Sequence, residues 1–213
     1  MSAQCGHSHS FDGTDPAYRR VLWIVIAANA ALFTVELAGG ALAGSQALKA
    51  DALDFLADAV TYGLSLAVIG WPLAARARVA LLKGLSLLAM GLWVFGTTLW
   101  HLAGPGLPQA EVMGVIGVMA LATNLGSVLL LMRYREGDAN VRSVWLCSRN
   151  DAIGNVAVMA AAGAVALTGT AWPDLVVALM MSGLFLTSAT QILRRSLAEM
   201  RQPASSQAHH RHA

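Results

Sequence analysis

The sequence predicts an all-α membrane protein, a bundle of six transmembrane helices. Three observations lead to this fold class. Hydrophobic residues make up 56% of the 213 positions and charged residues only 12%, whereas soluble domains carry about 25% charged residues. Six apolar stretches each approach or exceed the roughly 20 residues with which a helix crosses a bilayer. The connections between them are short, so a sizeable soluble domain is not expected.

The predicted helices follow one another with clear boundaries. Glycine and proline, which end helices and form turns, lie between the apolar stretches. The six expected spans are Val21–Leu42, Ala47–Trp71, Val79–Leu102, Val112–Met132, Val141–Leu167 and Leu175–Leu193. Turns are expected at Gly39-Gly40, Gly44-Ser45, Pro72, Gly104-Pro105-Gly106, Gly137-Asp138 and Gly169 with Pro173.

Positive charge is distributed unevenly between the two ends of these spans. Of the 14 Lys and Arg residues, Arg149 lies within the fifth span and Lys49 at one end, and all the others gather at the opposite end. Because cytoplasmic loops carry the excess of Lys and Arg, that opposite end is predicted to be cytoplasmic. Six spans then place both termini in the cytoplasm. The polar N-terminal segment lacks the pattern of a cleavable signal peptide.

The chain divides into one membrane domain and two tails. Residues 1–17 are predicted to form a cytoplasmic N-terminal tail, 18–198 the six-helix domain and 199–213 a short cytoplasmic C-terminal tail. The tails are rich in Ser, Gln and His, and their Cys and His residues are only a weak signal for metal binding. Cys5 lies in a tail and Cys147 in a span, so both are expected to be free thiols.

Two predicted helices carry ionisable pairs at a four-residue spacing. Asp54 and Asp58 lie in the second helix, and Cys147 and Asp151 lie in the fifth. This spacing places both members of a pair on one helix face, one turn apart. An ionisable group inside a membrane costs roughly 2.5–3.5 kcal/mol on insertion scales, so such groups normally face the protein interior and have a function there. Both pairs reach the middle third of the bilayer, where they can meet.

Further polar residues lie near these pairs. Asp51 shares the face of the second-helix pair but lies closer to the outer end, where it acts either as a ligand or as a group that supports ligands. Asn150 and Asn155 are candidates for the same supporting role in the fifth helix, and Arg149 points away from that pair. Glu36, in the outer third of the first span, is either a proton or cation carrier or a group at the membrane interface.

Three carboxylates and one thiol at the same depth predict a four-ligand site for a divalent metal, formed by Asp54, Asp58, Cys147 and Asp151. A thiolate shifts the preference from hard cations towards zinc and cadmium. Four anions cannot all stay charged in a low-dielectric interior without a cation, so metal binding should expel protons. The sequence therefore predicts the exchange of Zn²⁺ or Cd²⁺ for protons. The alternative is a proton-coupled exporter of organic cations, with Glu36 as the carrier and an aromatic-lined cavity.

The segments around both pairs resemble a known transporter family. Residues 44–58 resemble the second-helix signature of the cation diffusion facilitators, which are metal/proton antiporters, and residues 145–156 resemble their fifth-helix signature. Residues 172–174 and the apolar helix after them are similar to the sixth. The resemblance implies metal ligands at Asp54, Asp58, Cys147 and Asp151. Cys147 departs from the His that is usual at its position, which implies a preference for softer ions.

The same resemblance implies a short form of the family. Its members generally carry a cytoplasmic C-terminal domain that holds the dimer together, whereas only about 16 residues follow Leu197. A homodimer formed through the transmembrane helices is therefore expected. The partners are a divalent metal ion, protons and the lipid bilayer, without nucleic acid, enzymatic activity or a resident cofactor. The expected location is the bacterial inner membrane.

Overall fold

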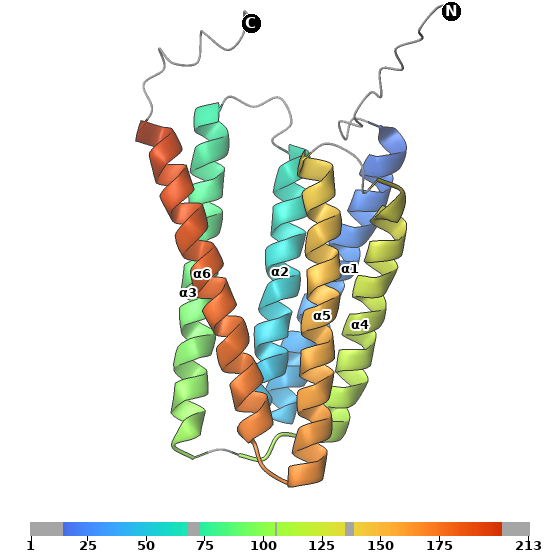
Figure 1. The fold of residues 1–213 in the computed structure, drawn as a ribbon, viewed down its shortest axis with the longest axis vertical. Helices are drawn as coiled ribbons and strands as arrows, with labels where there is room; N and C mark the ends of the chain where they lie inside the picture. The colour runs from blue at the N-terminus through green and yellow to red at the C-terminus, as the bar shows by residue number, and fades with distance from the viewer. Residues whose placement is uncertain (1–14, 68–72, 105, 135–138, 202–213) are drawn as a thin grey trace, which may run out of the picture.

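The fold is an all-α bundle, as the sequence predicts. The structure, a computed structural model, describes residues 15–67, 73–104, 106–134 and 139–201, and no strand occurs within these ranges. Six long helices run up and down the bundle, so that consecutive helices are antiparallel (Figure 1). They are α1 (Pro16–Ala43), α2 (Gln46–Ala67), α3 (Leu73–Leu102), α4 (Ala110–Leu131), α5 (Ala139–Thr168) and α6 (Trp172–Arg201), with the short 3-10 helix η1 (Met132–Tyr134) after α4.

Several helices extend beyond the apolar stretches that predict them. α1 already begins at Pro16, where Asp15 Oδ1 accepts a hydrogen bond from the Ala17 N–H at 2.8 Å and proline suits the first helical position. α6 continues to Arg201. Apolar length marks what a bilayer can cover, whereas a helix ends where its backbone is capped. The predicted end of the second span at Trp71 lies outside the described residues.

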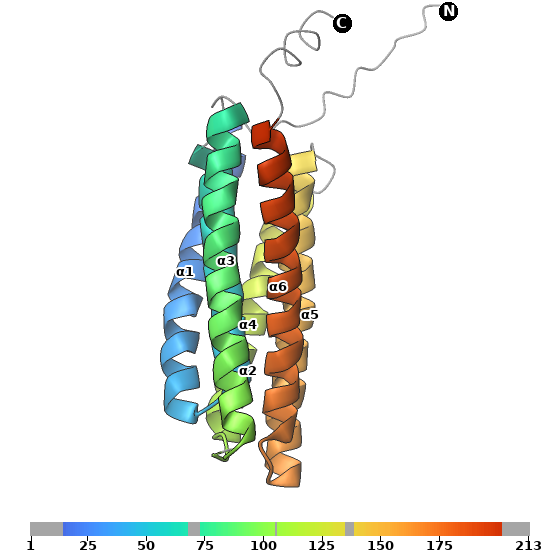
Figure 2. The ribbon, with the colours of Figure 1, turned by 90° about the vertical axis from the view of Figure 1, so that its left-hand side faces the viewer.

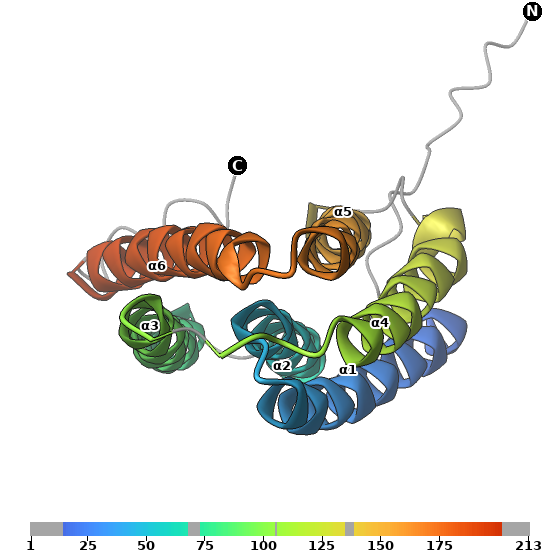
Figure 3. The same cartoon turned by 90° about the horizontal axis from the view of Figure 1, so that it is seen from below.

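The six helices form two layers of three. α1 packs opposite α4, α2 opposite α5 and α3 opposite α6. Viewed from below, α3, α2 and α1 form one row, and α6 and α5 lie across from them with α4 beside α1 (Figure 3). The perpendicular side view separates α1 from α5, with α3 and α6 in front (Figure 2). α2 and α5 are therefore the middle helices of the two layers and face each other.

Five of the helices are long and apolar enough to cross a membrane, namely α1, α3, α4, α5 and α6. The remaining one, α2, is less apolar because Lys49, Asp51, Asp54 and Asp58 lie along it. It is as long as α4, at 22 residues, and it contacts α1, α3, α5 and α6. Neighbouring helices therefore surround α2, and the interior of a bundle is where membrane proteins accommodate charged groups.

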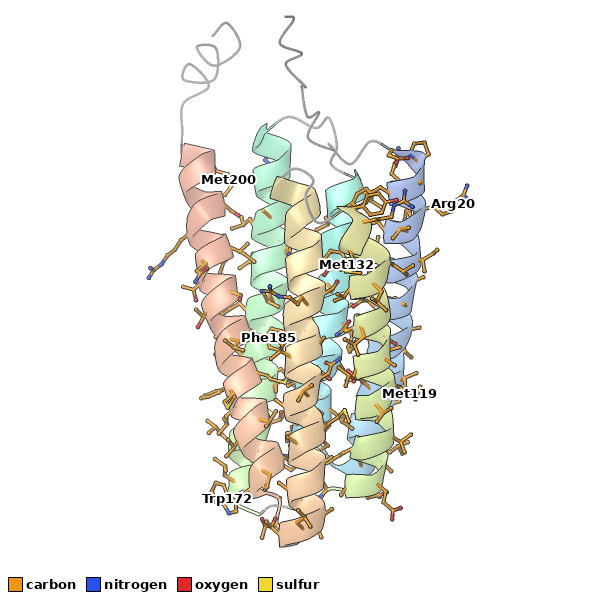
Figure 4. All side chains as sticks on the ribbon, turned by 45° about the vertical axis from the view of Figure 1, so that its right-hand side comes forward. Arg20, Met119, Met132, Trp172, Phe185 and Met200 are labelled. Carbon is orange, nitrogen blue, oxygen red and sulfur yellow. The ribbon has the colours of Figure 1, made fainter. Side chains whose placement is uncertain are left out.

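The outward faces of the bundle are apolar. Leu167 is 90% exposed and Trp100 81% exposed, and many further large hydrophobic side chains are also exposed. Met119 and Trp172 are examples of such outward side chains in Figure 4, whereas the labelled Phe185 is buried between helices. An apolar exterior of this extent suits contact with lipid rather than water. The membrane assignment from the sequence is confirmed.

The two ends of the bundle differ. We call the end with the α1–α2 and α5–α6 connections the outer end, because the positive charges predict that it faces away from the cytoplasm. Its interior is one apolar cluster to which all six helices contribute, with Ala43, Leu48, Val94, Met113, Val158 and Phe185 among its members. A second cluster, around Tyr18, Tyr62 and Tyr134, fills the inner end between α1, α2 and α4.

The turn predicted at Gly39-Gly40 is wrong, because α1 runs through both glycines and turns only at Gly44, which has a φ of 68°. The two glycines instead allow close packing of helices. A Cβ on Gly39 would collide with Ile116 of α4, and one on Gly40 would lie 3.1 Å from the Cβ of Leu48 on α2. The sequence shows small residues here, but it does not distinguish a turn from a helix contact.

Candidate metal site between the two central helices

The structure brings three of the four predicted ligands together. Asp54 and Asp58 lie on the face of α2 towards α5, and the Asp151 side chain of α5 lies within interaction range of both of them. Asp58 is only 9% exposed. Three neighbouring carboxyl groups within a protein interior do not all stay charged without a cation, because burial and like charges both disfavour the ionised form.

The fourth predicted ligand, Cys147, belongs to α5 one turn from Asp151 in the inward direction. Its side chain lies outside the described residues, as does that of Asn150. Among the side chains that are described, no three from His, Cys, Asp and Glu already stand in a geometry that could hold a metal ion. The three acids lie close to one another, and a metal would have to draw their oxygens into its own coordination shell.

Asp58 has a partner that the sequence analysis did not single out. The Tyr62 hydroxyl donates a hydrogen bond to Asp58 Oδ2 at 2.5 Å and lies 3.4 Å from Ser148 Oγ on α5. Tyr62 and Ser148 are each 1% exposed. Tyr62 follows Asp58 by four residues, so the helical spacing that paired Asp54 with Asp58 could have found it. It fixes the orientation of one carboxylate and joins α2 to α5.

A positive charge also borders the site. Lys83 of α3 lies within electrostatic range of Asp58. It lines a cavity of about 230 Å³ between α2 and α3, together with Leu56, Ala57, Val60, Ser86, Leu87 and Met90. No aromatic side chain belongs to this lining, so it is not the aromatic-lined cavity that the organic-cation alternative predicts. The cation at its wall would repel a positively charged ligand.

The remaining polar residues fall into two groups. Arg149 is exposed, in agreement with its predicted direction away from the site. Glu36, Asp51 and Asn155 are buried, with exposures of 0%, 1% and 0%. The carboxyl groups of Glu36 and Asp51 face each other across α1 and α2. Complete burial excludes the interpretation of Glu36 as a group at the membrane interface.

At the outer end, α6 holds the start of α2 through Asp174. Its Oδ2 accepts a hydrogen bond from the Gln46 N–H at 2.8 Å, and its Oδ1 accepts from the Ala47 N–H at 3.1 Å and from the Ser45 hydroxyl at 2.6 Å. Ser45 Oγ in turn accepts from the Leu48 N–H at 3.0 Å. A carboxylate from another helix therefore completes the N-terminal cap of α2. We call Asp174, Ser45 and Gln46 the outer clasp.

The Gln46 side chain extends this clasp to α3. Its Oε1 accepts a hydrogen bond from the Thr97 hydroxyl at 3.2 Å, and its Nε2 lies 3.5 Å from His101 Nε2. His101 Nδ1 lies 2.7 Å from the Thr97 carbonyl oxygen, to which it must donate because that oxygen can only accept. The clasp thus joins α2 to both helices of the α3–α6 pair at one level.

These features define a class of protein. Buried carboxylates shared by two central helices of a lipid-exposed bundle are typical of ion transporters. The chain belongs to the cation efflux family: the model of the cation efflux transmembrane domain matches residues 22–72 and 75–200. It is accordingly a multi-pass integral membrane protein, and its bacterial relatives indicate the plasma membrane.

Several curated bacterial proteins are similar to this chain. The metal cation efflux system protein CzcD of Cupriavidus metallidurans is 29% identical over 205 residues, which cover 90% of this chain and 63% of CzcD. The zinc transporter ZitB of Escherichia coli is 28% identical over 216 residues, covering 93% of this chain and 68% of ZitB. The cadmium, cobalt and zinc/H(+)-K(+) antiporter of Bacillus subtilis is 24% identical over 208 residues, covering 90% and 65%. The chain thus spans about two thirds of the length of these relatives.

Proposed function

We propose that the protein exports divalent transition-metal cations, Zn²⁺ and Cd²⁺ foremost, from the cytoplasm in exchange for protons. The observation that carries this proposal is the contact of Asp151 on α5 with Asp54 and Asp58 on α2, in the middle of the bundle. Relatives that bear the names of metal efflux proteins and zinc transporters support it. Asp54, Asp58, Cys147 and Asp151 are the proposed ligands of the transported ion.

The coupling to protons follows from the chemistry of the site. Three neighbouring carboxyl groups in a protein interior favour protonation, and a metal ion requires the same oxygens in their ionised form. The metal and the protons therefore compete for one set of atoms. When the metal leaves, the buried carboxylates take up protons again, because isolated negative charges are unfavourable in this environment. Each cycle then moves protons in the direction opposite to the metal.

Transport also requires that the site open to the two sides in turn. The outer end is closed by the apolar cluster and by the outer clasp. Release to the outside therefore requires these contacts to separate, through movement of α3 and α6 relative to α2. In this proposal both termini lie in the cytoplasm and two copies associate through their transmembrane helices.

The test is flux in proteoliposomes that contain the purified full chain, with one dye for Zn²⁺ and one for pH. We expect a Zn²⁺ gradient to drive proton movement in the opposite direction. Asp58→Ala and Asp151→Ala should each abolish both the Zn²⁺ flux and the proton flux. The control is Glu111→Gln, which changes an exposed acid in the first turn of α4 and should leave both fluxes intact. Unchanged flux in either site variant would remove the assignment.

The proposed role of Cys147 has a separate readout. A thiolate favours Cd²⁺ more strongly than a hydroxyl does, so Cys147→Ser should lower the ratio of Cd²⁺ to Zn²⁺ affinity by about tenfold. Isothermal titration with each metal measures this ratio. The ratio would stay constant if Cys147 only filled space, and it would also stay constant in the organic-cation alternative.

A further inference from the structure

A second layer of buried polar side chains lies outward of the proposed transport site. It consists of Glu36 on α1, Asp51 on α2 and Asn155 on α5, with exposures of 0%, 1% and 0%. Asp51 precedes Asp54 by three residues, and Asn155 follows Asp151 by four, so both lie about one turn, roughly 4.5–6 Å, further outward on the same helix faces. Three helices therefore place polar groups at one level.

These side chains have unsatisfied polar atoms. Both carboxyl oxygens of Glu36, Oδ2 of Asp51 and both Oδ1 and Nδ2 of Asn155 are buried and make no hydrogen bond of normal length. Glu36 and Asp51 lie within interaction range of each other, but neither carboxyl oxygen of Glu36 has a hydrogen-bond partner. Buried polar groups are nearly always paired with protein or water. Five unpaired atoms at one level therefore point to a ligand that they bind.

The surroundings allow little else to pair with them. Outward of this level, Ala47, Leu48, Val158 and Ala162 belong to the apolar cluster that closes the outer end. Inward lies the site of Asp54, Asp58 and Asp151. A ligand at this level can therefore arrive directly from the proposed transport site.

We propose that Glu36, Asp51 and Asn155 form a second, all-oxygen cation site, which receives the divalent metal from the transport site on its way out. This inference rests on the proposed function. Two carboxylates and one amide oxygen lack the thiolate of the inner site, so they suit harder cations and hold Zn²⁺ more weakly. Two divalent ions one turn apart repel each other, so the two sites are occupied in turn rather than together. A weaker outer site favours release.

Mn²⁺ is a suitable probe, because it prefers oxygen ligands and its bound fraction is measured by electron paramagnetic resonance. The full chain carrying Asp54→Asn and Asp58→Asn lacks the transport site, and we expect it to keep about one bound Mn²⁺ per chain. Adding Glu36→Gln should weaken that binding at least tenfold. Adding Glu111→Gln instead, at an exposed acid, should leave it unchanged. Absence of Mn²⁺ binding in the first variant, or residual binding that is insensitive to Glu36→Gln, overturns the proposal.

Asn155→Asp gives a test that does not depend on loss of function. It adds a third carboxylate to the outer site, so Mn²⁺ binding should tighten by about tenfold, an effect that a purely structural asparagine would not produce. Unchanged or weaker binding in a variant with a wild-type unfolding transition overturns the assignment of Asn155. These results are independent of the proposed function, because Zn²⁺ binding and flux in the wild-type chain can succeed or fail whatever the outer site does.

Discussion

The outer clasp leads to a quantitative prediction for Asp174→Ala. This change removes three hydrogen bonds, from the Gln46 and Ala47 N–H groups and from the Ser45 hydroxyl, at 2.8, 3.1 and 2.6 Å. A hydrogen bond to a charged group contributes about 1.5–3 kcal/mol, and the three are not additive because they share one side chain. Two buried backbone donors also lose their acceptor. We expect the free energy of unfolding to fall by about 3–5 kcal/mol.

Asp174→Asn provides the conservative comparison. The amide oxygen can still accept from Ser45 and Ala47, whereas the amide nitrogen cannot accept from Gln46. The loss should therefore be smaller, about 1–2 kcal/mol. Ser45→Ala removes a bond to the same carboxylate, so the double variant with Asp174→Ala should lose less than the sum of the single variants.

Equilibrium unfolding of the purified chain in mixed micelles, followed by circular dichroism, measures these differences. Glu111→Ala is the matched control, because Glu111 is an exposed acid in the first turn of α4 that caps no other helix. We expect the control to change stability by less than about 1 kcal/mol. A stability of Asp174→Ala within the range of this control would refute the idea that α6 anchors the start of α2.

Three further changes test other contacts. Tyr62→Phe removes the donor to Asp58, and we expect Zn²⁺ affinity to fall about tenfold in isothermal titration; equal affinity would show that the hydroxyl does not orient the ligand. Lys83→Met removes the cation near Asp58 and should raise Zn²⁺ affinity about fivefold. This factor corresponds to a repulsion of about 1 kcal/mol between Lys83 and the metal ion, which salt weakens. A fall in affinity would contradict this repulsion. Gly39→Ala should destabilise the bundle by about 1–3 kcal/mol in the same unfolding assay, because the added Cβ would collide with Ile116. Gly126→Ala is the control and should not destabilise the bundle, because a Cβ at Gly126 meets open space.

Much of the fold could be predicted from the sequence, because length and hydropathy indicate which stretches form helices that can cross a bilayer. α2 falls short of the hydropathy of the other five helices, because charged residues lie along it. The two ionisable pairs could also be predicted from the sequence, because a four-residue spacing places Asp54 with Asp58, and Cys147 with Asp151, on one helix face. The same spacing could have identified Tyr62 as a partner of Asp58, because it follows Asp58 by one helical turn.

Contacts between two helices do not follow from the sequence of either helix alone. The sequence does not distinguish the roles of small residues such as Gly63, Gly91 and Gly163. In the structure, a Cβ on Gly91 would lie 3.2 Å from Leu186, whereas a Cβ on either of the other two would meet open space. Whether a glycine serves packing depends on what lies opposite, and helical periodicity does not contain that information.

The sequence by itself determined the class of fold, the number of helices and the two helix faces that carry the ionisable pairs, because each of these depends on residues within one helix. Only the tertiary structure decided that α2 lies opposite α5, that Asp174 caps a helix 128 positions away, and that Glu36 lies beside Asp51. The physical reason is that such contacts depend on the order in which the helices pack, which the whole set of helix surfaces determines together. The polar groups that α1, α2 and α5 bring to one level are therefore a property of the assembled bundle.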